Sequence, residues 1–156
     1  MFKAFSRLFT LHRGASVDIT SSTCGHFHAW EIFAFEANPN LIPQIPKKPN
    51  TTILNKAIWT HDGTVEFYLA EDTLGSSVLG NKKTGNLAKT PTKVDSVDFG
   101  QWLKNNFSRD DYIFVKLDIE GAEYDVLENM LKDGTIVLVD RLYVEFHNVK
   151  VNVPAE

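Results

Sequence analysis

Residues 115–131, VKLDIEGAEYDVLENML, place three carboxylates where an apolar strand gives way to a helix. Asp118 lies on the strand side, Glu120 precedes Gly121, and Glu123 falls in the first helical turn. Negative charge near a helix N-terminus is favourable by about 0.3–1 kcal/mol. Helix stabilisation is therefore the simplest explanation for Glu123. For Glu120, helix stabilisation and a role in binding or catalysis are equally good explanations. Asp118 fits this explanation least, because it lies on the strand side.

Further polar residues follow other predicted strands. Glu36 comes directly after the apolar run EIFAF, residues 31–35, and just before a turn-forming Asn-Pro pair. Glu145 and His147 alternate with Phe146, so they share one face of a strand. In α/β folds, ligands bind outside the carboxyl ends of the strands. We expect five side chains to meet there, on one rim of the sheet: Glu36, Asp118, Glu120, Glu145 and His147.

A rim of this composition favours two kinds of chemistry. A carboxylate or an imidazole can act as a general base that removes a proton from a hydroxyl group. The same atoms could bind a divalent cation such as Mg²⁺ or Mn²⁺, although their spacing matches no standard metal motif. An acid at a strand end, such as Glu36, can also accept hydrogen bonds from both hydroxyls of a ribose. For a lone glutamate, a solvated residue before a turn is the plainer explanation.

The elements that position this rim indicate one α/β domain over residues 1–156. Buried strands are predicted at 31–35 and 112–119, a strand leading into a helix at 92–107, a helix at 122–133, and at least one more strand within 136–148. Their alternation predicts parallel strands with right-handed crossovers. Eight side chains are predicted to form the inner faces of the helices: Phe99, Trp102, Leu103, Phe107, Val126, Leu127, Met130 and Leu131.

The connections carry their own signals. Pro43, Pro46 and Pro49 exclude a long helix after the first buried strand. Two β-rich runs flank Asp62-Gly63 and predict a tight hairpin, which would add an antiparallel element. Residues 72–90 are rich in glycine and small polar residues, which predicts a loop of a length that is often functional.

Composition narrows the class of protein. The net charge of −4, without a basic block, argues against nucleic acid as the main partner. No apolar run is long enough to span a membrane, so we expect no membrane partner. The single cysteine, Cys24, excludes an internal disulfide and fits a cytoplasmic location. The first 14 residues are basic and could form a targeting segment, although a terminal element laid on the core is the simpler reading.

Six blocks of the sequence resemble, in the same order, the FkbM family of S-adenosylmethionine-dependent methyltransferases. They run from about residue 32 to residue 147: FAFEANP, NKAIWTHDGTVEFY, GSSV, VDSVDF, VKLDIEGAEYDVLENML and LYVEFH. KLDIEGAE is the most specific of them. The resemblance implies a Rossmann-like, mostly parallel sheet, S-adenosylmethionine as the cofactor, and O-methylation of a small molecule or a carbohydrate.

The resemblance also implies roles for particular residues. Glu36 would bind the ribose hydroxyls of the cofactor, and Ala57 and Ile58 would line its adenine side. Asp118 would lie near its methionine end and the centre of methyl transfer. For the base that removes the acceptor's proton, His147 is the first candidate, followed by the other catalytic candidates, Glu120 and Glu145.

The front of the domain departs from the family pattern. The family's first strand is followed by a glycine-rich turn of the form Asp-x-Gly-x-x-x-Gly, but here Thr20 takes the place of the first glycine and Gly25 comes one residue late. We therefore expect an incomplete sheet, without a regular strand-helix unit in residues 14–30 and without the final C-terminal strands, and weak cofactor binding. A degenerate, non-catalytic binding module is one alternative function, and a metal-dependent enzyme that uses the acidic rim is another.

The strand at the centre of the family's sheet is the one that this sequence barely encodes. Without it, the apolar runs at residues 31–36 and 112–119 would each expose an unpaired edge, which is costly. Residues 14–20, GASVDIT, alternate as a strand should and are the best internal candidate to fill the gap. If they fail to insert, two chains could associate through the open edges as a homodimer.

Overall fold

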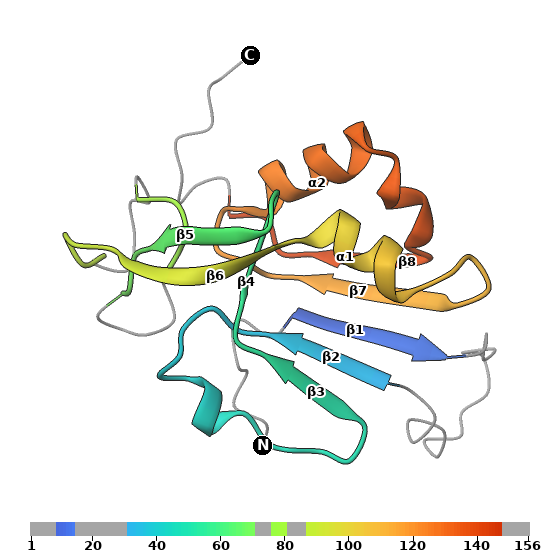
Figure 1. Ribbon diagram of the computed structural model, residues 1–156, viewed down its shortest axis with the longest axis horizontal. Coiled ribbons are helices and arrows are strands. Elements are labelled where there is room, and N and C mark those ends of the chain that lie inside the picture. Colours follow the sequence, from blue (N-terminus) through green and yellow to red (C-terminus); the bar gives the residue numbers. More distant parts are fainter. Residues whose placement is uncertain (1–8, 15–30, 71–75, 81–86, 148–156) are drawn as a thin grey trace.

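The computed structural model describes residues 9–14, 31–70, 76–80 and 87–147, with side chains from residue 31 onward (Figure 1). Its strands are β1 (Phe9–Gly14), β2 (Glu31–Phe35), β3 (Thr51–Leu54), β4 (Ala57–Trp59), β5 (Gly63–Phe67), β6 (Thr92–Asp98), β7 (Tyr112–Leu117) and β8 (Arg141–Val144). Its helices are α1 (Phe99–Asn106), α2 (Glu123–Lys132) and the short 3-10 helices η2 (Ile42–Gln44) and η3 (Thr135–Leu138). The sequence predicts irregular structure for residues 14–30; Gly14 instead ends β1, and residues 15–30 lie outside the described residues.

The main sheet has five strands in the order β3-β2-β1-β7-β8. β2 pairs parallel with β3, and β7 pairs parallel with β8. β1 pairs antiparallel with both of its neighbours, β2 and β7. Four strands of this sheet therefore point one way and β1 points the other way, as the arrows in Figure 1 show.

β1 fills the gap that the sequence predicts between β2 and β7. Leu11 lies opposite Phe33 on one side and opposite Val115 on the other, so neither neighbouring strand has an open edge here. The prediction that a strand fills the gap is confirmed, but the prediction that it consists of residues 14–20 is wrong. The strand lies upstream, at Phe9–Gly14, and the reason to expect a dimer through these two edges falls away.

A second, three-stranded sheet has the order β4-β6-β5. β6 lies between the two strands that flank Asp62-Gly63, parallel to β4 and antiparallel to β5. The predicted hairpin is therefore wrong as a pairing, although Gly63 does turn the chain with a positive φ of 132°. Instead, Ser96 lies opposite Ala57 on one side and opposite Gly63 on the other.

The expectation of a mostly parallel sheet is not confirmed for the described residues. Three strand pairings are parallel and three are antiparallel. The reversal of β1 accounts for two of the antiparallel pairings, because it replaces a strand that would be parallel in a Rossmann-like sheet. The broader prediction of a mixed α/β fold holds.

Both α-helices contribute to one apolar core against the sheet. α1 and α2 contact each other, and their buried residues share one core with those of β7, whose side chains are alternately buried and partly exposed. Phe33 and Phe35 of β2 make edge-to-face contacts with Trp102 of α1. Seven of the eight predicted inner-face residues are buried or packed against this core. The exception is Leu131, whose side chain is 65% exposed, so its prediction is wrong.

Local sequence explains where these helices begin and end. The Asp98 side chain accepts a hydrogen bond of 3.0 Å from the backbone N–H of Gln101 and so caps the start of α1. After α2, Gly134 adopts a left-handed conformation with φ of 78°, as the sequence predicts for a helix end. The proline-rich crossover forms only the single turn η2, also as predicted. Within the described residues, no helix has the length and apolar character needed to cross a membrane.

Candidate functional site

The carboxyl ends of β2, β7 and β8 lie along one edge of the main sheet, because these three strands point the same way. Glu36, Asp118 and Glu145 are the residues that directly follow them. β1 begins at this edge, since Phe9 lies opposite Phe35, and it ends at the opposite edge. The rim predicted from the sequence is therefore present. The chain, however, leaves β1 at the end of the sheet that lies opposite this rim.

A tight turn connects β7 to α2 and carries Glu120 with a positive φ of 58°. The next residue, Gly121, has a φ of 112°, which only glycine adopts readily. The fully buried carboxylate of Glu123 stabilises this turn, because it accepts hydrogen bonds from the backbone N–H groups of Ile119 and Gly121, both at 2.9 Å. The prediction that Glu123 stabilises the helix end is thus only part of its role.

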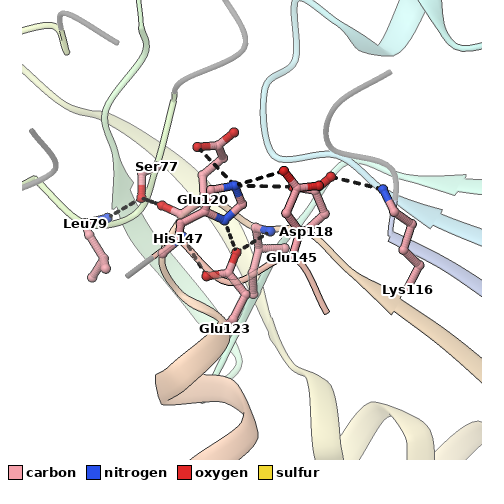
Figure 2. Close-up of polar contacts among 10 residues, drawn as sticks. Ser77, Leu79, Lys116, Asp118, Glu120, Glu123, Glu145 and His147 are labelled. Atoms are coloured by element: carbon pink, nitrogen blue, oxygen red, sulfur yellow. Dashed lines mark hydrogen bonds and ion pairs between the residues drawn. The ribbon is translucent and has the colours of Figure 1, made fainter. Parts of the chain in front are cut away.

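His147 is buried against the same carboxylate. Its Nδ1 lies 2.8 Å from Oε1 of Glu123 (Figure 2). Its Nε2 lies 3.9 Å from Oδ1 of Asp118, 3.9 Å from Oε2 of Glu120 and 3.7 Å from Oε1 of Glu145. Glu123 therefore orients the imidazole so that Nε2 faces three carboxylates, which is the convergence that the sequence predicts.

Asp118 is buried and carries an ion pair on its other oxygen. Lys116 donates a hydrogen bond of 3.0 Å to Oδ2 of Asp118. Burial raises the pKa of the Asp118 carboxyl above its ordinary value of 3.8, and the neighbouring charge of Glu145 adds to the rise. The hydrogen bond from Lys116 opposes both effects without cancelling them. A carboxyl group that is costly to ionise, at a strand end, is typical of a functional site.

A half-open pocket with a volume of about 40 Å³ lies beside this cluster. Its lining includes five of the residues singled out from the sequence: Glu36, Ala57, Ile58, Asp118 and Glu120. The remaining two, Glu145 and His147, are not among its lining residues. Ala57, Ile58 and Phe67 are buried and add apolar side chains to the lining of the pocket. The structure thus brings all seven residues to one region, and their roles remain predictions.

Glu36 is held rigidly at its side of the pocket. Its side chain is only 5% exposed, and Oε1 accepts a hydrogen bond of 2.7 Å from the backbone N–H of Asn38. The side chain of Asn55 donates to the backbone carbonyl of Glu36 at 2.7 Å. A solvated residue before a turn, the plainer expectation for a lone glutamate, is therefore wrong.

Sequence reasoning missed two residues that shape the site. Ser77, from the glycine-rich loop, donates a hydrogen bond of 2.9 Å to the carbonyl of Glu120 and so ties this loop to the turn after β7 (Figure 2). Glu123 was assigned to the helix end alone. The available signal for Glu123 was its place in the first helical turn, from which a glutamate side chain can reach back to backbone N–H groups that precede the helix. No local pattern identifies Ser77, because its partner lies 43 positions away in the sequence.

Comparisons with known proteins bear on this site. Neither the curated proteins nor the solved structures contain a match. A family model, the methyltransferase FkbM domain, matches residues 12–153. The match extends beyond the six resembling blocks at both ends and covers every residue of the candidate site. This chain belongs to the FkbM methyltransferase family.

Proposed function

We propose that this protein transfers a methyl group from S-adenosylmethionine to a hydroxyl group of a small molecule or a carbohydrate. The observation that carries the proposal is the pocket between Glu36 and Asp118, which combines buried carboxylates at two strand ends with apolar side chains. Membership of the FkbM family supports methyl transfer in general. The nature of the donor and the acceptor rests on the chemistry of the lining residues.

The lining residues suit the three chemical parts of this cofactor. Glu36 would accept hydrogen bonds from the ribose hydroxyls, and the apolar side chains of Ala57 and Ile58 would contact the adenine. Asp118 and Glu120 would supply negative charge beside the positively charged methionine end. When bound, the cofactor supplies a methyl group on a sulfonium sulfur.

The sequence before β2 bears on how tightly the cofactor is held. A glycine-rich turn lets the backbone approach the cofactor closely, and here Thr20 takes the place of the first glycine of that turn. We therefore expect weak binding, in the micromolar range or weaker.

On the acceptor side, the chain must hold a hydroxyl oxygen in line with the methyl group and remove its proton. Orientation of this kind supplies much of the rate in two-substrate reactions. The cluster of Asp118, Glu120 and His147 adjoins the pocket, because the first two residues belong to both. We propose that the acceptor's hydroxyl group binds at this shared border.

Calorimetry of the purified chain with S-adenosylmethionine tests the proposal through Glu36. Substitution of Glu36→Ala removes two charge-assisted hydrogen bonds to the ribose and should weaken binding by about 2–3 kcal/mol, or roughly a hundredfold. Glu128→Ala is the matched control, because Glu128 is exposed on α2 and is not among the lining residues of the pocket. Equal affinities in the wild type and the Glu36→Ala variant would contradict the assignment of Glu36 to the ribose.

A further inference from the structure

Three potential ligand groups come together beside the pocket. One ligand atom each from Asp118, Glu120 and His147 lies within 4.8 Å of the other two. All three residues are buried, between 3% and 5% exposed. They come from two places in the sequence, the turn after β7 and the segment after β8, so the fold itself assembles them.

Glu123 decides which nitrogen of His147 faces this cluster. Its carboxylate already accepts two backbone N–H groups, so it presents an acceptor to Nδ1 at 2.8 Å. The proton of a neutral imidazole therefore resides on Nδ1, and the lone pair on Nε2 is directed toward Asp118 and Glu120. A carboxylate behind a histidine in this way is the arrangement that orients histidine ligands in metal sites.

The distances across the cluster leave room for a cation at its centre. Nε2 of His147 lies 3.9 Å from one oxygen each of Asp118 and Glu120, so the three atoms surround a shared point without touching one another. A divalent cation at that point would be attracted by both buried carboxylates, and their low-polarity surroundings would strengthen the attraction. Lys116 donates to Oδ2 of Asp118, so Oδ1 is the oxygen that faces Nε2.

The space between the three ligand atoms fits a metal ion. For atoms separated by up to 4.8 Å, a point exists within roughly 2.8 Å of all three, and the usual ligand distances are about 2.3–2.6 Å for Ca²⁺ and about 2.0–2.1 Å for Mg²⁺. Small side-chain rotations would close the difference. One imidazole and two carboxylates combine the ligand preferences of the harder and the intermediate divalent metals.

We propose that Asp118, Glu120 and His147 bind a divalent metal cation, with Glu123 as the residue that orients the imidazole. This assignment gives the Nε2 lone pair to the cation, in place of the base role that the sequence suggests for His147. Three protein ligands leave coordination positions open toward the pocket, which Asp118 and Glu120 also line. The site would therefore take an acceptor that offers an oxygen ligand.

The catalytic consequence rests on the proposed function, whereas cation binding does not. A hydroxyl group next to the cation loses its proton more readily, because the positive charge stabilises the alkoxide. The proton would pass to Glu145, whose side chain is 55% exposed and whose Oε1 lies 3.7 Å from Nε2 of His147. The oxygen would then form its bond to the methyl carbon while the electron pair of the breaking C–S bond stays on sulfur.

Titration of the metal-free full-length chain with Mn²⁺ tests the site. Mn²⁺ binds most weakly in the usual order of first-row metals, so it makes a strict probe. Electron paramagnetic resonance should show one bound Mn²⁺ per chain. In the wild type, substoichiometric Mn²⁺ should broaden the imidazole proton signals of His147 before those of His61, which is exposed on the loop before β5. Equal broadening of both, or none, would overturn the proposal.

Variants provide a second, independent measurement. His147→Gln and Glu120→Gln each remove a ligand and should abolish saturable Mn²⁺ binding. Glu123→Gln leaves the ligands in place but loses their orientation, and should weaken binding by about 10–100-fold. Glu128→Gln, on the exposed face of α2, is the matched control and should bind as the wild type does. Circular dichroism shows which variants are folded, and full Mn²⁺ affinity in a folded His147→Gln variant would contradict the assignment.

Parallel calorimetry with S-adenosylmethionine distinguishes the two proposals. Bound Mn²⁺ together with no measurable cofactor binding would sink the proposed methyl donor and leave the metal site standing. Cofactor binding without any Mn²⁺ binding would do the reverse.

Discussion

At Glu120, backbone strain coincides with a candidate site residue. Among the described residues it is the non-glycine residue with a positive φ, at 58°. This conformation costs a side-chain-bearing residue about 1–2 kcal/mol. The strain is sustained because Ser77 holds the Glu120 carbonyl, while the Glu120 side chain faces both the pocket and the cluster. A glycine would relieve the strain, so the glutamate side chain is retained at a cost in stability.

Two substitutions at Glu120 separate strain from chemistry. Glu120→Ala keeps the strained conformation, whereas Glu120→Gly removes it. We expect the glycine variant to have the larger free energy of unfolding, by about 1 kcal/mol. Urea denaturation of both variants measures the difference. Neither variant should bind Mn²⁺, and an alanine variant as stable as the glycine variant would show that the turn is not strained.

Because the pKa of Asp118 is raised in the folded state, the free energy of unfolding depends on pH. Burial raises the pKa of Asp118 in the folded state above the ordinary value of 3.8 expected for the unfolded chain. Its contribution to stability is therefore greatest below that ordinary value and is lost as the pH rises through the folded-state pKa. Asp118→Asn removes this loss. As the pH rises from 3 to 7, the free energy of unfolding of the variant should increase relative to that of the wild type. Urea denaturation at both pH values in metal-free buffer measures this change.

The sequence suffices to predict which residues lie at the rim, but not which of them contact each other. Glu36, Asp118 and Glu145 each follow an apolar run, and the convergence of strand ends in α/β sheets suffices to bring them together. The contact between Glu123 and His147 depends on how the turn at Glu120 aims the first turn of α2. That turn has no sequence signal beyond Gly121.

At the scale of elements, periodicity predicts that a strand exists but not which way it runs. Apolar and polar residues alternate in residues 14–20 as they do in residues 9–14. Such an alternation looks the same whichever way the strand runs. The Asp-Gly pair likewise predicts a turn at Gly63, but not that β6 inserts between β4 and β5. Both errors concern long-range pairing, which a local pattern does not encode.

The packing of α1 against the end of α2 depends on Gly100. A Cβ atom at this position would overlap Oγ1 of Thr135 and lie 2.9 Å from Oδ2 of Asp133. Asp133 and Thr135 are themselves joined, since Oδ1 of Asp133 accepts a hydrogen bond of 2.6 Å from the Thr135 hydroxyl. The neighbours therefore cannot move apart freely.

Gly100→Ala should accordingly destabilise the protein, by about 1–3 kcal/mol. Asn105→Ala, at an exposed position of the same helix, is the control and should change the free energy of unfolding by less than about 0.5 kcal/mol. Thermal unfolding of the two variants measures both effects. Because alanine favours helix formation over glycine, a stabilised Gly100→Ala variant would show that Thr135 can give way.

For the whole molecule, the reversed β1 explains how the fold keeps a polar rim without the family's glycine-rich turn. In a parallel arrangement, the central strand would end at the rim and deliver that turn beside Glu36 and Asp118. Here the strand starts at the rim and ends at the opposite edge, where Gly14 lies opposite Tyr112. The acidic residues are unaffected, because they follow β2, β7 and β8.

The same strand determines the state of association that we expect. β1 satisfies the inner edges of β2 and β7 from within one chain, so no second copy is needed to cover them. Light scattering of the full-length protein should give the mass of one chain across a tenfold range of concentration. A chain that lacks residues 1–14 would expose both edges, and it should aggregate or associate. If the shortened chain instead remained monomeric and unfolded cooperatively, β1 would not be the element that closes the sheet.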